Sequence, residues 1–246
     1  MIKLNIMKSM KEKVWDFVNI PSIGYDEEDY YNHHLKKYGL VKEVIKNINP
    51  RCILDIGVAT GIFYSLLPDF HDKKVLGVDI VPEYIPILKK RGIKAQLCNI
   101  EKESILSSDG SFDMIICDSI LEHTLKPKHL TTEMHRVLKP GGIFIVVVPN
   151  ATSIIRRWNH LRGRSVFEPL IDNLYSRDYL SRCSVFYSEN ELRFILNGSQ
   201  LVVDRVAYIN ETSHDVNKLV IKVFRLFGAL VPQFRDVIFL VGRKSL

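Results

Sequence analysis

Short runs of almost purely apolar residues recur along the first 150 positions and alternate with segments of helical periodicity. The clearest run, IFIVVV, occupies 143–148, and similar runs begin at Ile53, Val75 and Met114. A strand without polar positions must be covered on both faces, and parallel sheets with helical crossovers provide that environment. The sequence therefore predicts an α/β fold with a doubly wound, Rossmann-like, mostly parallel sheet and helices on both faces.

The limits of these runs locate the elements. The predicted strands are 52–56, 74–79, 93–97, 112–117, 142–149, 201–209 and 236–244. The predicted helices are 27–48, 61–68, 82–91 and 126–138. Ser188, with Glu191 three residues later, has the pattern of a capping box and predicts one more helix. LKPGG at 138–142 predicts a helix stop and a turn. Because a long excursion separates the last two strands, we expect the final strand to be antiparallel.

The predicted organisation is an N-terminal helical cap over 1–48 and one α/β domain over 49–246. Two segments interrupt the domain: a polar, basic and aromatic lid insertion at about 151–187, and a helical excursion at about 212–234. The excursion is apolar, with basic residues at intervals of four and three. That pattern suits a membrane surface, a homodimer interface or a cover for the sheet edge, and the sequence leaves these three alternatives open.

The positive charge is concentrated in the second part of the chain. The net charge is +6, and residues 151–246 hold 14 basic and 9 acidic residues, or +5 of that total. The densest segment contains Arg156, Arg157, Trp158, Arg162 and Arg164 and no acid. Guanidinium groups bind phosphates and carboxylates, so these residues are candidates for binding an anionic acceptor, and a solvated helix face is the alternative. So modest a charge argues against a nucleic-acid partner.

Other sequence signals concern location and metals. No apolar run reaches the roughly 20 residues that a membrane span requires, and the first residues lack the pattern of a secretory signal. The four cysteines form no C-x-x-C pair, and neither H-E-x-x-H nor a Cys/His cluster occurs. The sequence therefore predicts a cytoplasmic protein without a metal, peripheral at a membrane if the excursion lies on one.

The stretch ILDIGVATGIF at 53–63 carries the strongest chemical signal. An apolar run ends in Asp55, the chain turns through Gly57 and Gly61, and a helix with free backbone amides is expected next. The following strand ends in Asp79, whose carboxylate can accept hydrogen bonds from the two hydroxyls of a ribose. A glycine turn with a second strand ending in an acid predicts a nucleoside site at the carboxyl edge of the sheet.

A dinucleotide fits this stretch poorly. The G-x-G-x-x-G pattern needs glycines at 57, 59 and 62, and the chain has Gly57, Ala59 and Ile62. Asp55 would also repel a pyrophosphate, whereas it would attract a ligand with a positive ammonium and sulfonium. A nicotinamide oxidoreductase is therefore disfavoured.

The motifs together resemble those of class I S-adenosylmethionine-dependent methyltransferases, of the type 11/12 group that acts on small molecules or in glycan pathways. LDIGVATG resembles their first motif, D/E-x-G-x-G-x-G, and VLGVDI and LCNIEKESI resemble the second and third. FDMIICDSILEHT is similar to the fourth motif, and RVLKPGGIFIVVVPN to that of the fifth strand. The resemblance covers residues 40–150 and extends more loosely to 185–210 and the final strand.

This resemblance implies a cofactor, S-adenosyl-L-methionine, which would become S-adenosyl-L-homocysteine. Asp55 would face its ammonium group, Asp79 would bind the ribose, and Ile80 would pack on the adenine. Asp118 would lie below the reactive methyl group, with His123 close by. The complete implied cofactor set is Asp55, Gly57, Val58, Ala59, Gly61, Asp79, Ile80, Asn99, Ile100 and Asp118.

Two residues depart from the family pattern. Ala59 replaces the middle glycine, which is harmless at negative φ and otherwise costs about 1 kcal/mol or more. Asn99 stands where Asp is frequent, although an amide oxygen can still accept from the adenine amino group. These departures leave a second interpretation open, a SAM-binding partner or regulatory protein without activity.

The expected reaction is methyl transfer to a small-molecule acceptor, namely a hydroxyl of a sugar, a glycolipid or a similar compound, anionic or lipid-linked. A hydroxyl needs a base, and the candidates are His123 and Asp118, although His123 also suits a structural role at a helix start. CDSI stands where enzymes that methylate nucleic-acid amino groups carry N/D-P-P-Y/F. A phenolic or protein acceptor is the alternative.

Overall fold

A computed structural model describes residues 27–67, 70–163, 185–210, 226 and 228–246. Its strands are β1 (Cys52–Ile56), β2 (Lys74–Asp79), β3 (Lys94–Leu97), β4 (Phe112–Asp118), β5 (Leu138–Pro149), β6 (Leu201–Ile209) and β7 (Val237–Lys244). Its α-helices are α2 (Glu27–Ile48), α3 (Tyr84–Lys90), α4 (Pro127–Val137), α5 (Ile154–Leu161) and α7 (Glu189–Asn197). Its short 3₁₀ helices are η1 (Ile62–Leu66), η2 (Phe70–Asp72), η3 (Leu121–His123) and η5 (Pro232–Phe234).

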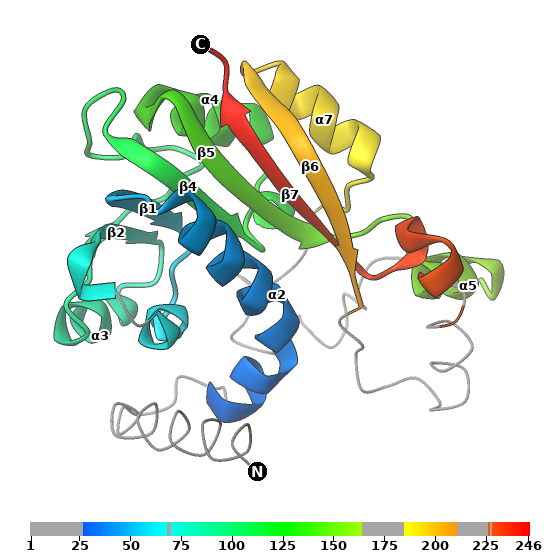
Figure 1. Cartoon of the computed structure of the whole chain (residues 1–246). Helices are drawn as coiled ribbons and strands as arrows, with labels where there is room; N and C mark the ends of the chain where they lie inside the picture. Colours follow the sequence, from blue (N-terminus) through cyan, green and yellow to red (C-terminus); the bar gives the residue numbers. More distant parts are fainter. Residues whose placement is uncertain (1–26, 68–69, 164–184, 211–225, 227) are drawn as a thin grey trace.

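The strands form one mixed sheet in the order β3-β2-β1-β4-β5-β7-β6 (Figure 1). β1 to β5 are parallel to one another, and β7 pairs antiparallel with both β5 and β6. The predicted doubly wound sheet with an antiparallel final strand is therefore confirmed. The chain order reverses between β1 and β4, and in open α/β sheets ligands bind beside the carboxyl ends of strands at such a point.

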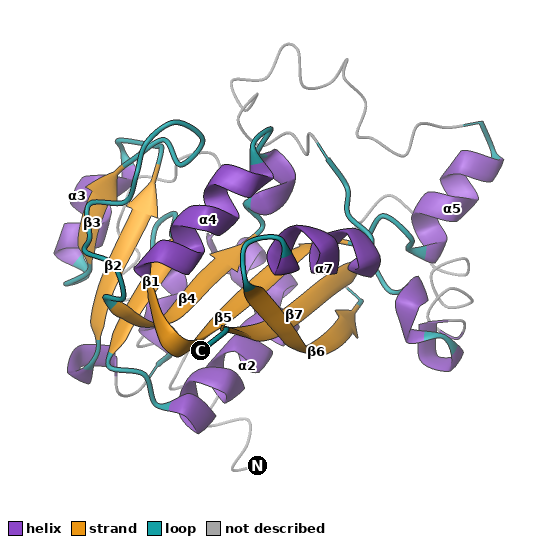
Figure 2. Ribbon diagram, turned by 90° about the horizontal axis from the view of Figure 1, so that it is seen from above, coloured by secondary structure: helices purple, strands orange, loops and turns teal. Residues whose placement is uncertain are grey.

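Helices cover both faces of the sheet, as Figure 2 shows. On one face α2 places Tyr38 and Val41 in the same apolar cluster as Ile53 of β1. On the other face α7 places Leu192 in a cluster with Leu54, the next residue of that strand. Successive strand residues point to opposite faces, so apolar residues at both positions are what burial on two sides requires.

The helix predicted at 61–68 is the short 3₁₀ helix η1 instead. Gly61, which precedes η1, adopts φ +71°, and Leu67, which follows it, is extended. Only five residues lie between these two non-helical positions, so two full α-helical turns do not fit. β1, β2 and β6 have the predicted bounds, whereas α3 spans 84–90 rather than 82–91.

The segment LKPGG at 138–142 is part of a strand rather than a turn before one. α4 ends at Val137, one residue before the predicted end, and β5 starts at once, because Leu138 pairs with Phe112 of β4. The next pair joins Met114 to Ile143, so the additional residues of β5 form an irregularity of the β-bulge type. Gly141, at φ +70°, supplies the left-handed residue within it.

The capping box before α7 is confirmed. The Ser188 hydroxyl accepts the N–H of Glu191 at 3.4 Å, and the Glu191 carboxylate accepts the N–H of Ser188 at 2.7 Å. Two of the free N–H groups at the helix start are thereby satisfied.

Parts of the two interrupting segments lie outside the described residues. α5 and residues 185–187 belong to the predicted lid insertion, and η5 with residues 226 and 228–231 belongs to the predicted excursion. The remainder of each segment is not described, and neither are residues 1–26, which precede α2 in the predicted N-terminal cap.

Candidate functional site

Asp55, Asp79 and Asp118 meet at the carboxyl ends of β1, β2 and β4. Asp55 is opposite Gly77 on one side and opposite Ile116 on the other. Asp79 and Asp118 each lie two residues beyond these partners, and an even spacing keeps a side chain on the same face. All three carboxylates therefore lie on the face that α2 covers.

Asp79 holds the turn that follows β1. Its Oδ2 accepts the N–H of Ala59 at 2.9 Å, and its Oδ1 accepts the N–H of Val81 at 3.0 Å. Burial raises the pKa of Asp79, and the hydrogen bonds from Val81 and Ala59 oppose that rise. A carboxylate has about four lone-pair sites, so Asp79 keeps acceptor capacity for a ligand hydroxyl.

The turn itself contains three left-handed residues. The φ values are +77° at Gly57, +48° at Ala59 and +71° at Gly61. Gly57 also has no space for a side chain, because an added Cβ would lie 2.0 Å from Cδ1 of Ile120. The negative φ that would make Ala59 harmless is absent, so its methyl group costs about 1–2 kcal/mol in this conformation.

Asp55 is buried and accepts a hydrogen bond from the Tyr64 hydroxyl at 2.9 Å. Burial, with smaller contributions from the nearby Asp118 and Asp79, raises the pKa of Asp55 to about 7, while the Tyr64 hydrogen bond opposes the rise. Tyr64 was not among the predicted site residues. The signal that could have found it is a residue with a hydroxyl in an otherwise apolar run three positions after the turn.

Lys37 of α2 neutralises Asp118. Its Nζ lies 3.0 Å from Oδ1 of Asp118, and its side chain is 1% exposed. The prediction missed Lys37 too, although a helical spacing argument could have found it. Lys37 precedes Val41 by four residues and Ile45 by eight, so it lies on the buried stripe of α2.

A cavity of about 60 Å³ lies between the turn and α2. It is lined by Tyr38, Val41, Asp55, Gly57, Val58, Ala59, Thr60, Ile62, Phe63, Ile116 and Asp118. The structure thus brings together five of the predicted cofactor residues around one cavity. Gly61, Asp79, Ile80, Asn99 and Ile100 do not line it.

The residues predicted for the adenine lie at the next two strand ends. Ile80 directly follows Asp79 and is 45% exposed, an open apolar side chain beside the acid. Asn99 follows β3, and its amide oxygen accepts the N–H of Glu101 at 3.1 Å. The N–H of Cys98 donates to the carbonyl of Asp79 at 2.9 Å, which places Asn99 and Ile100 beside the end of β2.

The predicted acceptor residues lie on a different element. The Arg156 guanidinium of α5 stacks on the Phe186 ring at 3.6 Å, and that of Arg157 lies 5.5 Å from the Phe234 ring centre. Trp158 is 43% exposed, with the guanidinium of Arg162 at 5.9 Å from its ring. These contacts are stacking contacts of cations on aromatic faces. Arg164 lies outside the described residues.

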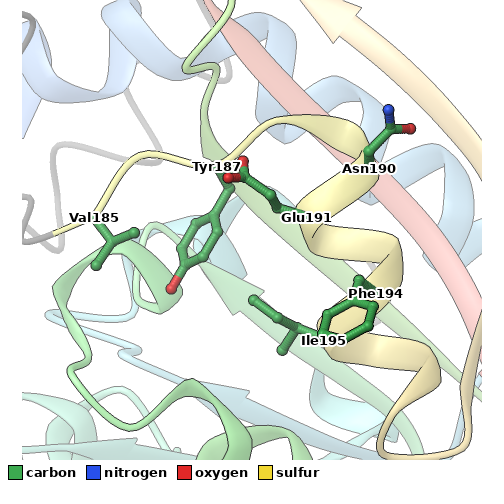
Figure 3. Close-up of a pocket in the computed structure, with 6 residues that line it drawn as sticks. All are labelled: Val185, Tyr187, Asn190, Glu191, Phe194 and Ile195. Carbon is green, nitrogen blue, oxygen red and sulfur yellow. The ribbon is translucent and has the colours of Figure 1, made fainter.

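A larger hollow of about 340 Å³ lies beside α7 (Figure 3). Figure 3 shows Tyr187 with Val185 on one side and Phe194 and Ile195 of α7 on the other. None of the three strand-end aspartates lines this hollow. It is therefore separate from the cavity beside the glycine turn.

The residues at the strand ends fit an adenosyl cofactor. Asp55 offers a carboxylate for an ammonium group, Asp79 offers lone pairs for ribose hydroxyls, and Ile80 offers an exposed apolar surface for a base. Among the described residues there is no group of three or more His, Cys, Asp or Glu side chains that could hold a metal ion. In the same part of the chain, no helix has the length and apolar character needed to cross a membrane.

Comparisons with known proteins agree with this arrangement. A family model described as a methyltransferase domain matches residues 54–146. An uncharacterised protein of Methanocaldococcus jannaschii is 36% identical over 102 residues, which cover 42% of this chain and 46% of its own length. A tRNA U34 carboxymethyltransferase of Campylobacter jejuni is 24% identical over 165 residues, covering 54% of this chain and 56% of its own. The chain thus spans about half the length of these curated relatives.

A solved structure shows the same fold. It is the complex of a Haloferax volcanii methyltransferase with the Trm112 methyltransferase activator, similar to this chain with a TM-score of 0.59. The likeness covers 89% of this chain and 91% of that one, at 17% identity.

Ala59→Gly should stabilise the protein, because it relieves the methyl group of its left-handed conformation. We expect a gain of about 1 kcal/mol, or roughly 2–4 °C in Tm for a chain of this size. The control is Ala95→Gly in the regular strand β3, which should lose about 0.5–1 kcal/mol. Urea unfolding measures both, and a loss of stability in both variants would contradict the strain assigned to Ala59.

Asp55→Asn should change how stability depends on pH. A carboxyl group whose pKa is about 7 in the folded protein and near 4 when unfolded makes the folded state less stable as pH rises between these values. Asparagine lacks this titration. The variant should therefore gain stability relative to the wild type from pH 4 to pH 7, by up to the order of 4 kcal/mol, and the difference should level off above.

Unfolding by urea at several pH values would measure this difference, with exposed Asp72→Asn as the control. A difference between Asp55→Asn and the wild type that does not vary with pH would show that Asp55 ionises normally in the folded protein.

Proposed function

We propose that this chain, whose residues 54–146 belong to the methyltransferase domain family, transfers a methyl group from S-adenosyl-L-methionine to a small-molecule acceptor. The observation that carries the proposal is the meeting of three aspartates with a left-handed turn at the point where the strand order of the sheet reverses. Both the family match and the class I order of the strands support it.

The cofactor residues keep the roles inferred from the sequence. We assign the ammonium group to Asp55, the ribose to Asp79 and the adenine to Ile80, with Asn99 and Ile100 at its edge. The backbone of the turn from Gly57 to Gly61 lies between the two acids. Among the described residues, Asp55 has no cation as a hydrogen-bond partner, so an ammonium group would favour its ionised form.

The bound cofactor supplies an electrophilic methyl carbon, and the chain must orient the acceptor and exclude water. Tyr38 and Val41 of α2 line the cavity and help to separate it from solvent. Asp118 is already paired with Lys37, so we assign it an orienting role. His123, the last residue of η3, is 24% exposed, and we assign it the acceptor's proton.

The acceptor that best suits the described residues is a hydroxyl of a sugar, a glycolipid or a similar anionic compound. The support comes from α5, where Arg156 stacks on Phe186 and Trp158 is partly exposed. Guanidinium groups bind phosphates and carboxylates, and flat aromatic rings pack on sugars. A tRNA acceptor is the second candidate, because one relative is named for a tRNA nucleoside.

Cofactor binding tests the class of enzyme. In calorimetry, S-adenosyl-L-homocysteine should bind the wild type, and Asp79→Asn should weaken binding at least about tenfold because the amide cannot accept at both positions. Asp204→Asn on β6, which removes a surface partner of Arg243, should bind like the wild type. Equal affinities for the wild type and Asp79→Asn would show that the ribose does not lie at Asp79.

Transfer of label tests the acceptor. Tritium from the methyl group of S-adenosyl-L-methionine should appear in a pool of small glycans and lipid-linked sugars, and Asp79→Asn should abolish its appearance. Total tRNA, incubated in parallel, should stay unlabelled. Label in tRNA alone would replace the small-molecule acceptor with the second candidate.

A further inference from the structure

Glu122 is a buried acid that the proposed function does not yet use. It lies on η3, four residues beyond Asp118, and it is 1% exposed. Its Oε2 is buried without a hydrogen-bond partner in the part of the chain that the structure describes. A buried polar atom without a partner costs free energy, so it calls for a physical explanation.

Glu133 of α4 is a buried acid with a structural role, and its carboxylate oxygens both have hydrogen-bond partners. Its Oε1 accepts from Arg136 at 2.9 Å, and its Oε2 accepts from Arg136 at 2.8 Å and from the N–H of Ile105 at 3.0 Å. These partners lower the pKa of Glu133. Glu122 is more deeply buried and has no comparable side-chain partners among the described residues, so packing alone does not account for an acid at this position.

Glu122 faces charged and titratable groups from several elements. Its surroundings include Lys37 of α2, Cys117 and Asp118 of β4, its neighbour His123, Arg156 of α5 and Tyr187 before α7. Burial, with a further contribution from Asp118, raises the pKa of Glu122 to about 8, and a hydrogen bond from its own backbone N–H, with Lys37 and Arg156, opposes the rise. The side chain therefore gains or loses its proton near neutral pH.

His123 is the partly exposed titratable neighbour of Glu122. Its Nε2 lies 4.0 Å from Oε1 of Glu122, and its side chain is 24% exposed. On the inner side, the N–H of Val185 donates to the Glu122 carbonyl at 3.0 Å, and the Tyr187 hydroxyl donates to the Leu121 carbonyl at 3.5 Å. The segment before α7 thus packs against η3 where Glu122 is enclosed, while the imidazole stays partly open.

We propose that Glu122 is a positioning residue for His123, with its carboxyl group facing the imidazole on the acceptor side of the site. The inference rests on the proposed function, because it explains how His123 could serve as the base there. The imidazole accepts the proton of the acceptor, and Glu122, once it is ionised, stabilises the imidazolium that forms. This arrangement explains why a buried acid lies next to a partly open imidazole, with Oε1 of Glu122 as the oxygen that faces it.

The step balances with the components already named. The O–H bond of the acceptor breaks as its proton forms an N–H bond on His123. The acceptor oxygen uses an electron pair to form the new O–C bond to the methyl carbon. The S–C bond breaks, and its electron pair stays on sulfur. Glu122 changes no covalent bond unless the proton moves on to it from His123.

The test is a titration of His123 in the full chain with ¹⁵N-labelled histidine, followed by NMR. The imidazole nitrogen shifts report protonation, and His123→Asn assigns the signal. In the wild type, the His123 shift should change in two steps, with the upper step near pH 8 where Glu122 titrates. In Glu122→Gln only one step should remain, and Glu122→Asp should restore an upper step.

Glu133→Gln is the matched control, because it removes a buried acid that has its own partners, and it should keep both steps. A single step in the wild type, or two steps that persist in Glu122→Gln, would overturn the inference. The number of steps in the wild-type titration of His123 tests the inference even if Glu122→Gln does not fold. Calorimetry with S-adenosyl-L-homocysteine on the same samples tests the proposed function separately, since the titration of His123 requires no cofactor.

Discussion

Three aspartates on the neighbouring strands β1, β2 and β4 point to the face of the sheet that α2 covers. The register of the strands places them there, because side chains two residues apart on a strand point to the same face. Their carboxylates gather where the strand order of the sheet reverses, at the edge that the glycine turn also borders. Three acids within one buried region repel one another and lose their hydration. The elements around them must therefore supply hydrogen-bond donors and positive charge, which explains much of the local structure.

Each acid is compensated in a different way. Asp79 receives two backbone N–H groups, one of which fixes the turn after β1. Asp118 receives the ammonium group of the buried Lys37. Asp55 receives, from the described residues, a hydrogen bond from the neutral hydroxyl of Tyr64, which does not offset the rise in pKa that burial causes. The acid with the weakest compensation is thus the one that we assign to the positive group of the cofactor.

Two buried glutamates also differ in how well their charge is compensated, and the difference shows where the fold keeps a group that lowers its stability. Glu133 is held by Arg136 and a backbone N–H, whereas Glu122 keeps an oxygen without a partner in the described residues. Ala59 likewise keeps a left-handed conformation that glycine would adopt more easily. Both costs lie beside the proposed site, while the sheet beneath it is regular and buried on both faces. Strain and unsatisfied groups often collect at sites of function.

The sequence alone determined the strands, the turn and the three aspartates, because apolar runs, glycines and acids at strand ends are local signals. The bounds of β1, β2 and β6 follow from such runs, and so does the capping box at Ser188. Tertiary structure alone decided the partners of the acids and the φ of Ala59. Lys37 meets Asp118 across 81 positions of the chain only because α2 packs over β4, and Glu122 is enclosed only because residues near 185 return to η3. Contacts between distant segments depend on how helices pack on the sheet, and no local pattern of residues carries that information.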